Sequence, residues 1–289
     1  MDLVTDQFTV WLKELLIEGI LFFLGGLFDE VNTQVGNIAS QVGQTPSGWH
    51  SGVFSMIRNL SETVIVPIAG LILAFVLTYE LIQMVIDRNN LQEVDTWMFF
   101  KWIFKSAIAI AIVTNTFNIV MAIFDIAQHV VHSSAGVIIG NTNLSSAALV
   151  SNLQTDLEQM DAAVLFGLFL ESFIVSLSMK VISLCIMVVI FGRMIEIYLT
   201  TSLGPIPLAT LANRDWSQVG QNYLRSLLAL GFQGFLILVC VGIYAVLVQS
   251  ISISNNIHIA IWTCLGYTVL LCFSLFKTGS MAKSIFNSH

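Results

Sequence analysis

Charged residues are scarce in this sequence of 289 residues. Only 10% of them are Asp, Glu, Lys or Arg, whereas 56% are hydrophobic. An average soluble domain has about 25% charged residues, and a water-soluble fold of this size needs a charged exterior. The composition therefore excludes a soluble globular protein and is typical of a helix bundle that exposes apolar side chains to lipid.

Motifs for catalysis and for metal or phosphate binding are also missing. The sequence contains no glycine-rich phosphate loop, no G-x-S-x-G, no H-E-x-x-H and no C-x-x-C pair. We therefore expect no enzyme, no cofactor and no metal site. His129 and His132 lie one helical turn apart, but we interpret them as a solvated helix end. The Lys and Arg residues are scattered, which argues against duplex DNA binding by the chain itself.

Five apolar segments are long enough to cross a membrane as helices. A hydrocarbon core about 30 Å thick requires about 20 helical residues. The segments are Glu62–Ile86, Met98–Ile126, Ala162–Tyr198, Tyr223–Val248 and His258–Phe276. The third is longer than one crossing needs, so we expect it to tilt, bend or project. We therefore predict an all-α polytopic membrane bundle with about five transmembrane helices.

The residues before these spans are more polar. Val10–Phe28 has three charged residues in its first turns, so we favour an interfacial or partly embedded helix over a sixth crossing. Asp29–Ser61 is rich in Ser, Asn, Gln and Gly and is predicted to be an exposed extracytoplasmic loop. We therefore divide the chain into residues 1–61, with the amphipathic helix and this loop, and residues 62–289, the transmembrane bundle.

The distribution of Lys and Arg predicts the orientation, since these residues are retained in cytoplasmic loops. They occur in and just after Asp87–Trp97, after the third span, and in the carboxyl-terminal tail. His132–Asp161 and Ser250–Asn256 contain none. The two kinds of segment alternate, so one topology fits: the loop before the first span is extracytoplasmic and the carboxyl terminus of this multi-pass protein is cytoplasmic.

Ionisable residues within apolar runs suggest a different function. Charge in hydrocarbon is costly unless it is paired or hydrated, and we single out Glu80, Glu171 and Lys180 as intramembrane charged residues. They are compatible with a secondary transporter or small-ion channel, which we keep as the alternative. Transporters usually have paired broken helices in two repeated halves, whereas this chain has one strong interruption. A purely structural membrane anchor is a third interpretation.

That interruption is the sharpest local signal in the sequence. Gly204 and Pro205 stop the preceding helix, because proline lacks a donor and clashes with the turn before it. Pro207 can start a short amphipathic element, which ends in Asn213-Arg214-Asp215-Trp216.

At this loop the chain resembles a known family, the TrbL-like polytopic membrane subunits of conjugative type IV secretion systems, particularly short Gram-positive forms. The matching residues are Arg193-x-x-Glu196-Ile197-Tyr198, then Leu203-Gly204-Pro205-Ile206-Pro207-Leu208-Ala209, and Trp216. Similarity in the number and order of spans covers most of the chain. This sequence departs from larger members in lacking a large central extracytoplasmic domain and a long carboxyl-terminal tail.

The resemblance implies a non-enzymatic channel or scaffold subunit that helps DNA or a DNA–protein conjugate cross the cytoplasmic membrane. It implies as partners other secretion components including cytoplasmic ATPases, further copies of this chain, membrane lipid, and single-stranded DNA in transit. We expect partner contacts on the cytoplasmic loop motif. Its residues are Arg193, Glu196, Gly204, Pro205, Pro207, Arg214 and Trp216.

Overall fold

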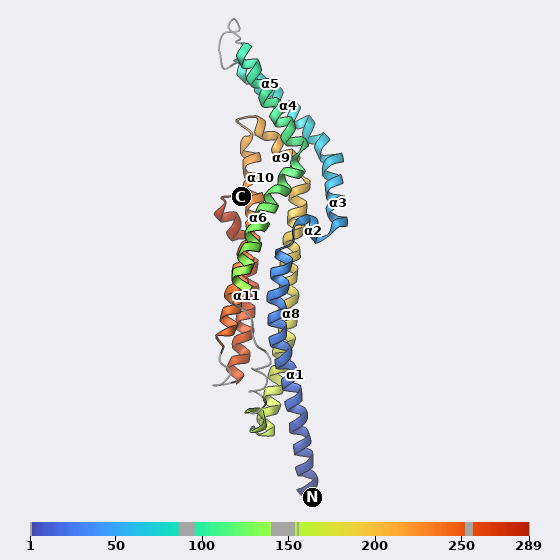
Figure 1. The fold of residues 1–289 in the computed structure, drawn as a ribbon, viewed down its shortest axis with the longest axis vertical. Helices are drawn as coiled ribbons and strands as arrows, with labels where there is room; N and C mark the ends of the chain where they lie inside the picture. Colours follow the sequence, from blue (N-terminus) through green and yellow to red (C-terminus); the bar gives the residue numbers. More distant parts are fainter. Residues whose placement is uncertain (1, 87–95, 140–153, 155, 252–256, 289) are drawn as a thin grey trace. The chain divides into compact units, whose positions relative to one another are not determined.

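The computed structural model describes residues 2–86, 96–139, 154, 156–251 and 257–288. Helices make up nearly all of these ranges and no strand occurs in them, so the prediction of an all-α fold is confirmed (Figure 1). The helices in chain order are α1 (Asp2–Val42), α2 (Pro46–Trp49), α3 (Ser51–Leu60), the π-helical η1 (Ser61–Ile65), α4 (Val66–Ile86), α5 (Thr96–Thr114), α6 (Thr116–Ile139), α8 (Ala162–Ser202), α9 (Pro205–Ala209), the 3-10 helix η2 (Thr210–Ala212), α10 (Ser217–Gln249) and α11 (Ile257–Ile285).

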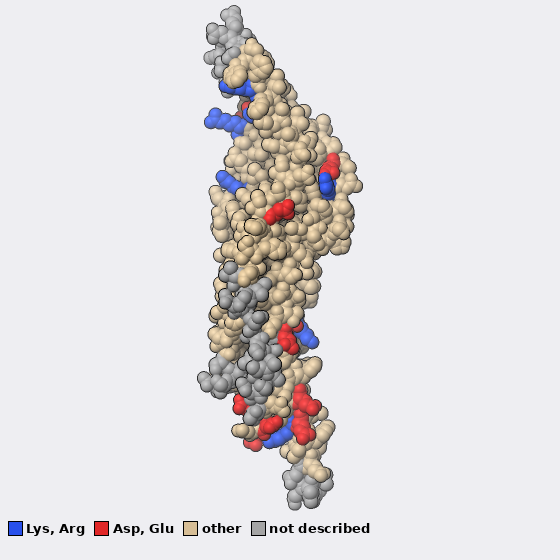
Figure 2. All heavy atoms as spheres, in the orientation of Figure 1, with Lys and Arg blue, Asp and Glu red and all other residues tan. Residues whose placement is uncertain are grey.

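Among the described residues, five helical segments are long and apolar enough to cross a membrane. They are Ser51–Ile86, Thr96–Thr114, Ala162–Ser202, Ser217–Gln249 and Ile257–Ile285. Each corresponds to one of the five predicted spans. Uncharged residues cover most of the visible surface in Figure 2, as expected for helices that face lipid. The five-span prediction is therefore confirmed, although two expectations about helix boundaries are wrong.

The second predicted span, Met98–Ile126, is not one continuous helix. It is interrupted at Asn115, where α5 ends and α6 begins. Asn115 donates a side-chain hydrogen bond to the carbonyl oxygen of Ala111 at 2.9 Å, and the Thr114 hydroxyl donates to Ile110 at 2.9 Å. Such side-chain bonds to the preceding turn compete with the helical ladder and bend helices. Only α5 therefore corresponds to the second span.

The segment 29–61, predicted to be a loop, is largely helical. α1 continues to Val42, and α2 and α3 follow. Val31, Val35, Ile38 and Val42 are buried, and their spacing places them on one helical face. The Ser, Asn and Gln residues that suggested a loop fall largely on the rest of the surface. Likewise, α6 extends into the predicted loop His132–Asp161, of which residues 140–153 and 155 lie outside the described ranges.

Two compact units make up the chain, each assembled from distant segments. Unit 1 comprises Met1–Val42, Ser133–Ile190 and Ile237–Lys277, and unit 2 comprises Gly43–His132, Phe191–Leu236 and Thr278–His289. These units are defined by packing. The division into residues 1–61 and 62–289, which concerns placement in the membrane, stays a prediction.

Within unit 1, α1 and α8 run side by side in the same direction (Figure 1). The Phe23 ring lies 5.6 Å from that of Phe169, centroid to centroid. Further along both helices, the Ser183 hydroxyl donates to Glu30 at 2.8 Å. Near their starts, the Lys13 ammonium donates to the carbonyl oxygen of Met160 at 2.8 Å. The residue numbers of the contacting partners increase together along both helices, so α1 and α8 form a parallel pair.

Candidate functional site

The loop that follows α8 packs onto the α4–α5 hairpin of unit 2. We call residues 203–216 the docked loop. From it, Ile206, Ala209 and Ala212 pack against an apolar surface of both helices. The residues of that surface are Ala69, Ile72, Leu73, Val76 and Leu77 of α4 and Trp102, Ala109 and Val113 of α5. The segment predicted to contact partners is thus a short helical element held in place by the hairpin.

Glycine is required at the start of the docked loop. A Cβ atom at Gly204 would lie 2.4 Å from the Tyr223 hydroxyl oxygen and 2.9 Å from Cγ2 of Thr116. Its backbone is ordinary right-handed helix, so the constraint is the close approach of α10 and α6 and not an unusual dihedral angle. α8 ends at Ser202, just before Gly204 and Pro205, as the sequence predicts. The short helix α9 begins at Pro205 and not at the predicted Pro207, because a proline fits the first helical position, where its missing N–H would have no partner.

Proline and threonine fix the other end of this element. The carbonyl oxygen of Pro207 accepts a hydrogen bond from the Thr210 hydroxyl at 2.7 Å, and the same hydroxyl oxygen accepts from the backbone N–H of Gly220 at 3.1 Å. Thr210 therefore ties α9 to the first turn of α10. A Cβ at Gly220 would lie 2.7 Å from the Pro207 carbonyl oxygen, so α9 and α10 also make close backbone contact.

A polar cluster joins the docked loop to the hairpin. We call Glu80, Gln83, Lys105, Asn213 and Asp215 the polar clamp. The Asn213 amide donates to Glu80 at 2.5 Å and to Gln83 at 3.0 Å, and Lys105 forms an ion pair with Glu80. Gln83 in turn donates to Asp215 at 2.7 Å. Glu80, which the sequence marks as an intramembrane charge, is therefore compensated by a cation and an amide.

The exposed part of the docked loop carries Arg214 and Trp216. The Trp216 ring is 41% exposed and lies against Phe75 and Tyr79 of α4, at 5.7 and 6.3 Å between centroids. Arg214 is exposed. These two side chains are available to a partner, whereas their neighbours hold the loop.

Arg193 and Glu196 lie one turn apart on α8 but have different surroundings. Arg193 is buried and donates through Nε to the carbonyl oxygen of Leu230 at 3.3 Å and through Nη2 to that of Gly231 at 3.5 Å, so it joins α8 to α10. Glu196 accepts a hydrogen bond from Lys283 at 2.9 Å on the surface. Arg193 thus acts within the helix packing and is not displayed to a partner in this structure.

The other two intramembrane charges belong to unit 1 and lie apart from each other. Glu171 on α8 contacts His258 on α11, with 2.6 Å between Oε2 and Nδ1. Lys180 is exposed and lines a hollow between α1 and α8. Neither residue belongs to the polar clamp, so the charges predicted within the membrane do not form one common site in the described residues.

Sequence reasoning missed Asn213, Gln83 and the role of Lys105. Asn213 closes the clamp across more than a hundred residues of sequence, and nothing local identifies its partner. A weak signal was present: Glu80 and Gln83 lie three residues apart, and Lys105 follows on the next helix. Such residues in two adjoining apolar helices would suggest a buried polar contact between them.

The spans, the docked loop and the polar clamp define a multi-pass α-helical membrane protein. A family model described as TrbL/VirB6 plasmid conjugal transfer like protein matches residues 31–205. Because the match covers more than half of the chain, the protein belongs to the TrbL/VirB6 plasmid conjugal transfer-like family. It includes Arg193, Glu196, Gly204 and Pro205 and ends before the rest of the docked loop. No curated protein and no solved structure gives a significant match.

Family membership confirms the resemblance seen in the sequence. It implies a subunit of a conjugal transfer system and a multi-pass membrane location.

Proposed function

We propose that this protein is a channel or scaffold subunit of a conjugative type IV secretion system and helps DNA or a DNA–protein conjugate cross the cytoplasmic membrane. Membership of the family supports the conjugal role and is the observation that carries the proposal. The five apolar helices support a position within the membrane. Since the sequence has no nucleotide-binding motif, the energy for transfer is assigned to partner ATPases.

Contacts within unit 2 support the proposed orientation. The polar clamp joins the end of α4, the start of α5 and the docked loop, all of which the Lys and Arg distribution assigns to the cytoplasm. Lys283 in the carboxyl-terminal tail contacts Glu196, near the end of α8. Segments that touch one another outside the hydrocarbon core lie on the same side of a membrane. These two contacts and the Lys and Arg distribution support a cytoplasmic carboxyl terminus.

The docked loop is the surface we assign to partner binding. Trp and Arg are enriched among the residues that dominate binding energy at interfaces, and Trp216 and Arg214 are exposed there. The rigid attachment of the loop to the hairpin reduces the entropy lost on binding. We propose that this surface contacts other secretion components, including a cytoplasmic ATPase, and that the protein forms homo-oligomers.

A mating assay tests the function directly. The gene is deleted in its native host and complemented in trans, and transfer of a resident mobile element to a recipient is counted. We expect loss of transfer, restored by complementation, with unchanged growth. The deletion strain that carries the empty complementation vector serves as the matched control. Unchanged transfer after deletion would contradict the proposal.

The alternative of a secondary transporter or small-ion channel rests on the charged residues within the spans. Glu80 and Glu171 each have a basic side chain beside them, Lys105 and His258. These separate pairs do not build a shared substrate site, and family membership favours conjugation. Uptake assays on the deletion strain would reveal a transport role if transfer were unchanged.

A further inference from the structure

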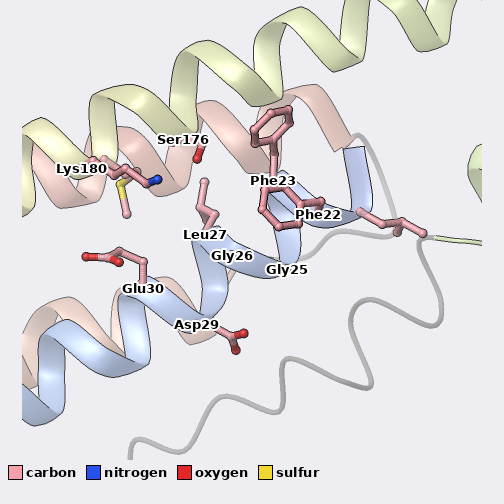
Figure 3. A pocket seen from close by; sticks show the side chains of 11 residues that line it. Phe22, Phe23, Gly25, Gly26, Leu27, Asp29, Glu30, Ser176 and Lys180 are labelled. Carbon is pink, nitrogen blue, oxygen red and sulfur yellow. The ribbon is translucent and has the colours of Figure 1, made fainter. Parts of the chain in front are cut away.

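A hollow of about 370 Å³ lies between α1 and α8 within unit 1. Phe22, Phe23 and Leu27 of α1 and Met179 of α8 supply apolar walls, and Gly25 and Gly26 leave room beside them. Figure 3 shows Ser176 and Lys180 on α8 and Glu30 on α1 along the hollow. The lining residues are Leu21, Phe22, Phe23, Gly25, Gly26, Leu27, Asp29, Glu30, Ser176, Met179 and Lys180. Polar and charged groups therefore line one side of an otherwise apolar space.

The position of Lys180 places this hollow at membrane depth. α8 is 41 residues long, about twice the 20 or so residues that one crossing requires. A crossing that begins anywhere from Ala162 to Lys180 contains Lys180. Only a crossing confined to the last part of α8 avoids it, and that crossing would contain Arg193 instead. Every crossing that begins between Ala162 and Lys180 therefore carries Lys180 into the bilayer, together with Glu171 if it begins early or with Arg193 if it ends late.

The charges around the hollow are only partly compensated by the chain. The Glu30 carboxylate accepts hydrogen bonds from Ser183 at 2.8 Å and Gln34 at 2.9 Å. Lys180 has no carboxylate within ion-pair distance among the residues that the structure describes. Asp29 lines the rim and its carboxylate points away from α8 (Figure 3). Each ion would be costly in contact with lipid tails, whereas water would hydrate them all.

We propose that water fills this hollow within the membrane, so that the α1–α8 face of unit 1 borders an aqueous space and not lipid. Glu30 and Lys180 balance each other along the hollow, and the Asp29 carboxylate adds negative charge at its rim, which favours entry of small cations over anions such as phosphate. α1 is then embedded beside α8 and is not an interfacial helix. This inference does not depend on the conjugation role, because hydration is measured directly.

Cysteine accessibility tests the proposal in the full-length protein. Cys185, Cys240, Cys264 and Cys272 are first replaced by Ala, and Ser176→Cys is compared with the matched neighbour Leu177→Cys, which is exposed on another face of α8. Membrane fragments open on both sides are treated with a membrane-impermeant trimethylammonium methanethiosulfonate. A thiol reacts as the thiolate, which forms only in water, so we expect Ser176→Cys to react at least about tenfold faster.

A second variant and a second reagent sharpen the test. Gly26→Cys on the opposite wall has open space around its Cβ, so it tolerates the substitution even if Ser176→Cys does not fold. The negatively charged sulfonate reagent should react more slowly than the cationic one at both hollow positions. Equal rates at residues 176 and 177, or reaction only with a lipid-soluble maleimide, would show that lipid fills the hollow and overturn the proposal. Faster reaction with the sulfonate reagent would overturn the cation preference.

Discussion

The two units differ in charge although both are built from apolar helices. Unit 1 contains ten acidic and three basic residues, whereas unit 2 contains eight of each, so the whole net charge of −7 belongs to unit 1. In unit 2, Glu80 and Glu196 each contact a lysine, whereas Lys180 in unit 1 faces a hollow. The ion pairs of unit 2 thus compensate much of its charge, and the same contacts hold the docked loop in place. The ions of unit 1 need water or partner groups around them.

The largest effect is expected from a substitution in the polar clamp, which removes the charge compensation between Glu80 and Lys105 in unit 2. Glu80→Lys places two cations side by side and removes one of the two acceptors of the Asn213 amide. We expect it to lower the free energy of unfolding by about 2–3 kcal/mol, less than for a fully buried pair because Lys105 is 40% exposed. The double variant with Lys105→Glu should recover part of the loss. Thermal unfolding in detergent measures both.

Glu62→Lys is the matched control for that experiment. Glu62 pairs with Arg58 on one helix surface at 2.8 Å, and both side chains are about half exposed. Exposed pairs of this kind contribute about 0–1 kcal/mol. An equal loss in Glu62→Lys and Glu80→Lys would contradict the view that the clamp anchors the docked loop.

The next largest effect concerns the packing of unit 2 at Gly204. Gly204→Ala brings a methyl group against Tyr223 and Thr116 and should destabilise the protein by about 1–3 kcal/mol, the usual range for overpacking. Gly70→Ala on α4 has nothing within 4 Å of the new Cβ and should be neutral or stabilising by up to about 1 kcal/mol. Protein level in membranes and the midpoint of thermal unfolding distinguish them. Similar behaviour of the two variants would show that α10 does not approach Gly204 closely.

How far the sequence predicts this structure depends on the range of the interactions. The five spans follow from hydropathy, and the stop at Gly204-Pro205 follows from proline chemistry, because both are local properties. The helix over residues 29–42 was also encoded locally, in the spacing of Val31, Val35, Ile38 and Val42. Its Ser, Asn and Gln content is typical of a loop, but the helical spacing of these four apolar residues determines the structure, so the loop prediction is wrong.

Other features were beyond local sequence patterns. The break at Asn115 lies inside an apolar run, and side-chain hydrogen bonds, not hydropathy, determine it. The contact of Asn213 with Glu80 joins residues 133 positions apart, so only the packed fold reveals it. Burial of Arg193 likewise depends on α10, and the motif alone did not indicate that this residue faces inward.

A smaller effect on stability is expected at the exposed surface of unit 2. Trp216→Ala should change the free energy of unfolding by about 1 kcal/mol, since the ring is 41% exposed. If the docked loop contacts a partner, transfer in the mating assay should fall at least about tenfold at normal protein level. Trp97→Ala, at a more exposed tryptophan on α5, is the matched control and should leave transfer unchanged. Loss of transfer in both variants would contradict the proposal that the docked loop in particular contacts a partner.

The smallest effect on stability is expected in unit 1, at Lys180. Lys180→Leu removes a hydrated ion, breaks no ion pair within the described residues and should change the free energy of unfolding by less than about 1 kcal/mol. Transfer should be only mildly reduced, because the residue lines a wet space and is not assigned a role in coupling. Lys180→Arg retains the charge and serves as the control. Complete loss of transfer in Lys180→Leu at normal protein level, with Lys180→Arg active, would instead show that this positive charge is essential. The uncompensated ions of unit 1 would then take part directly in transfer.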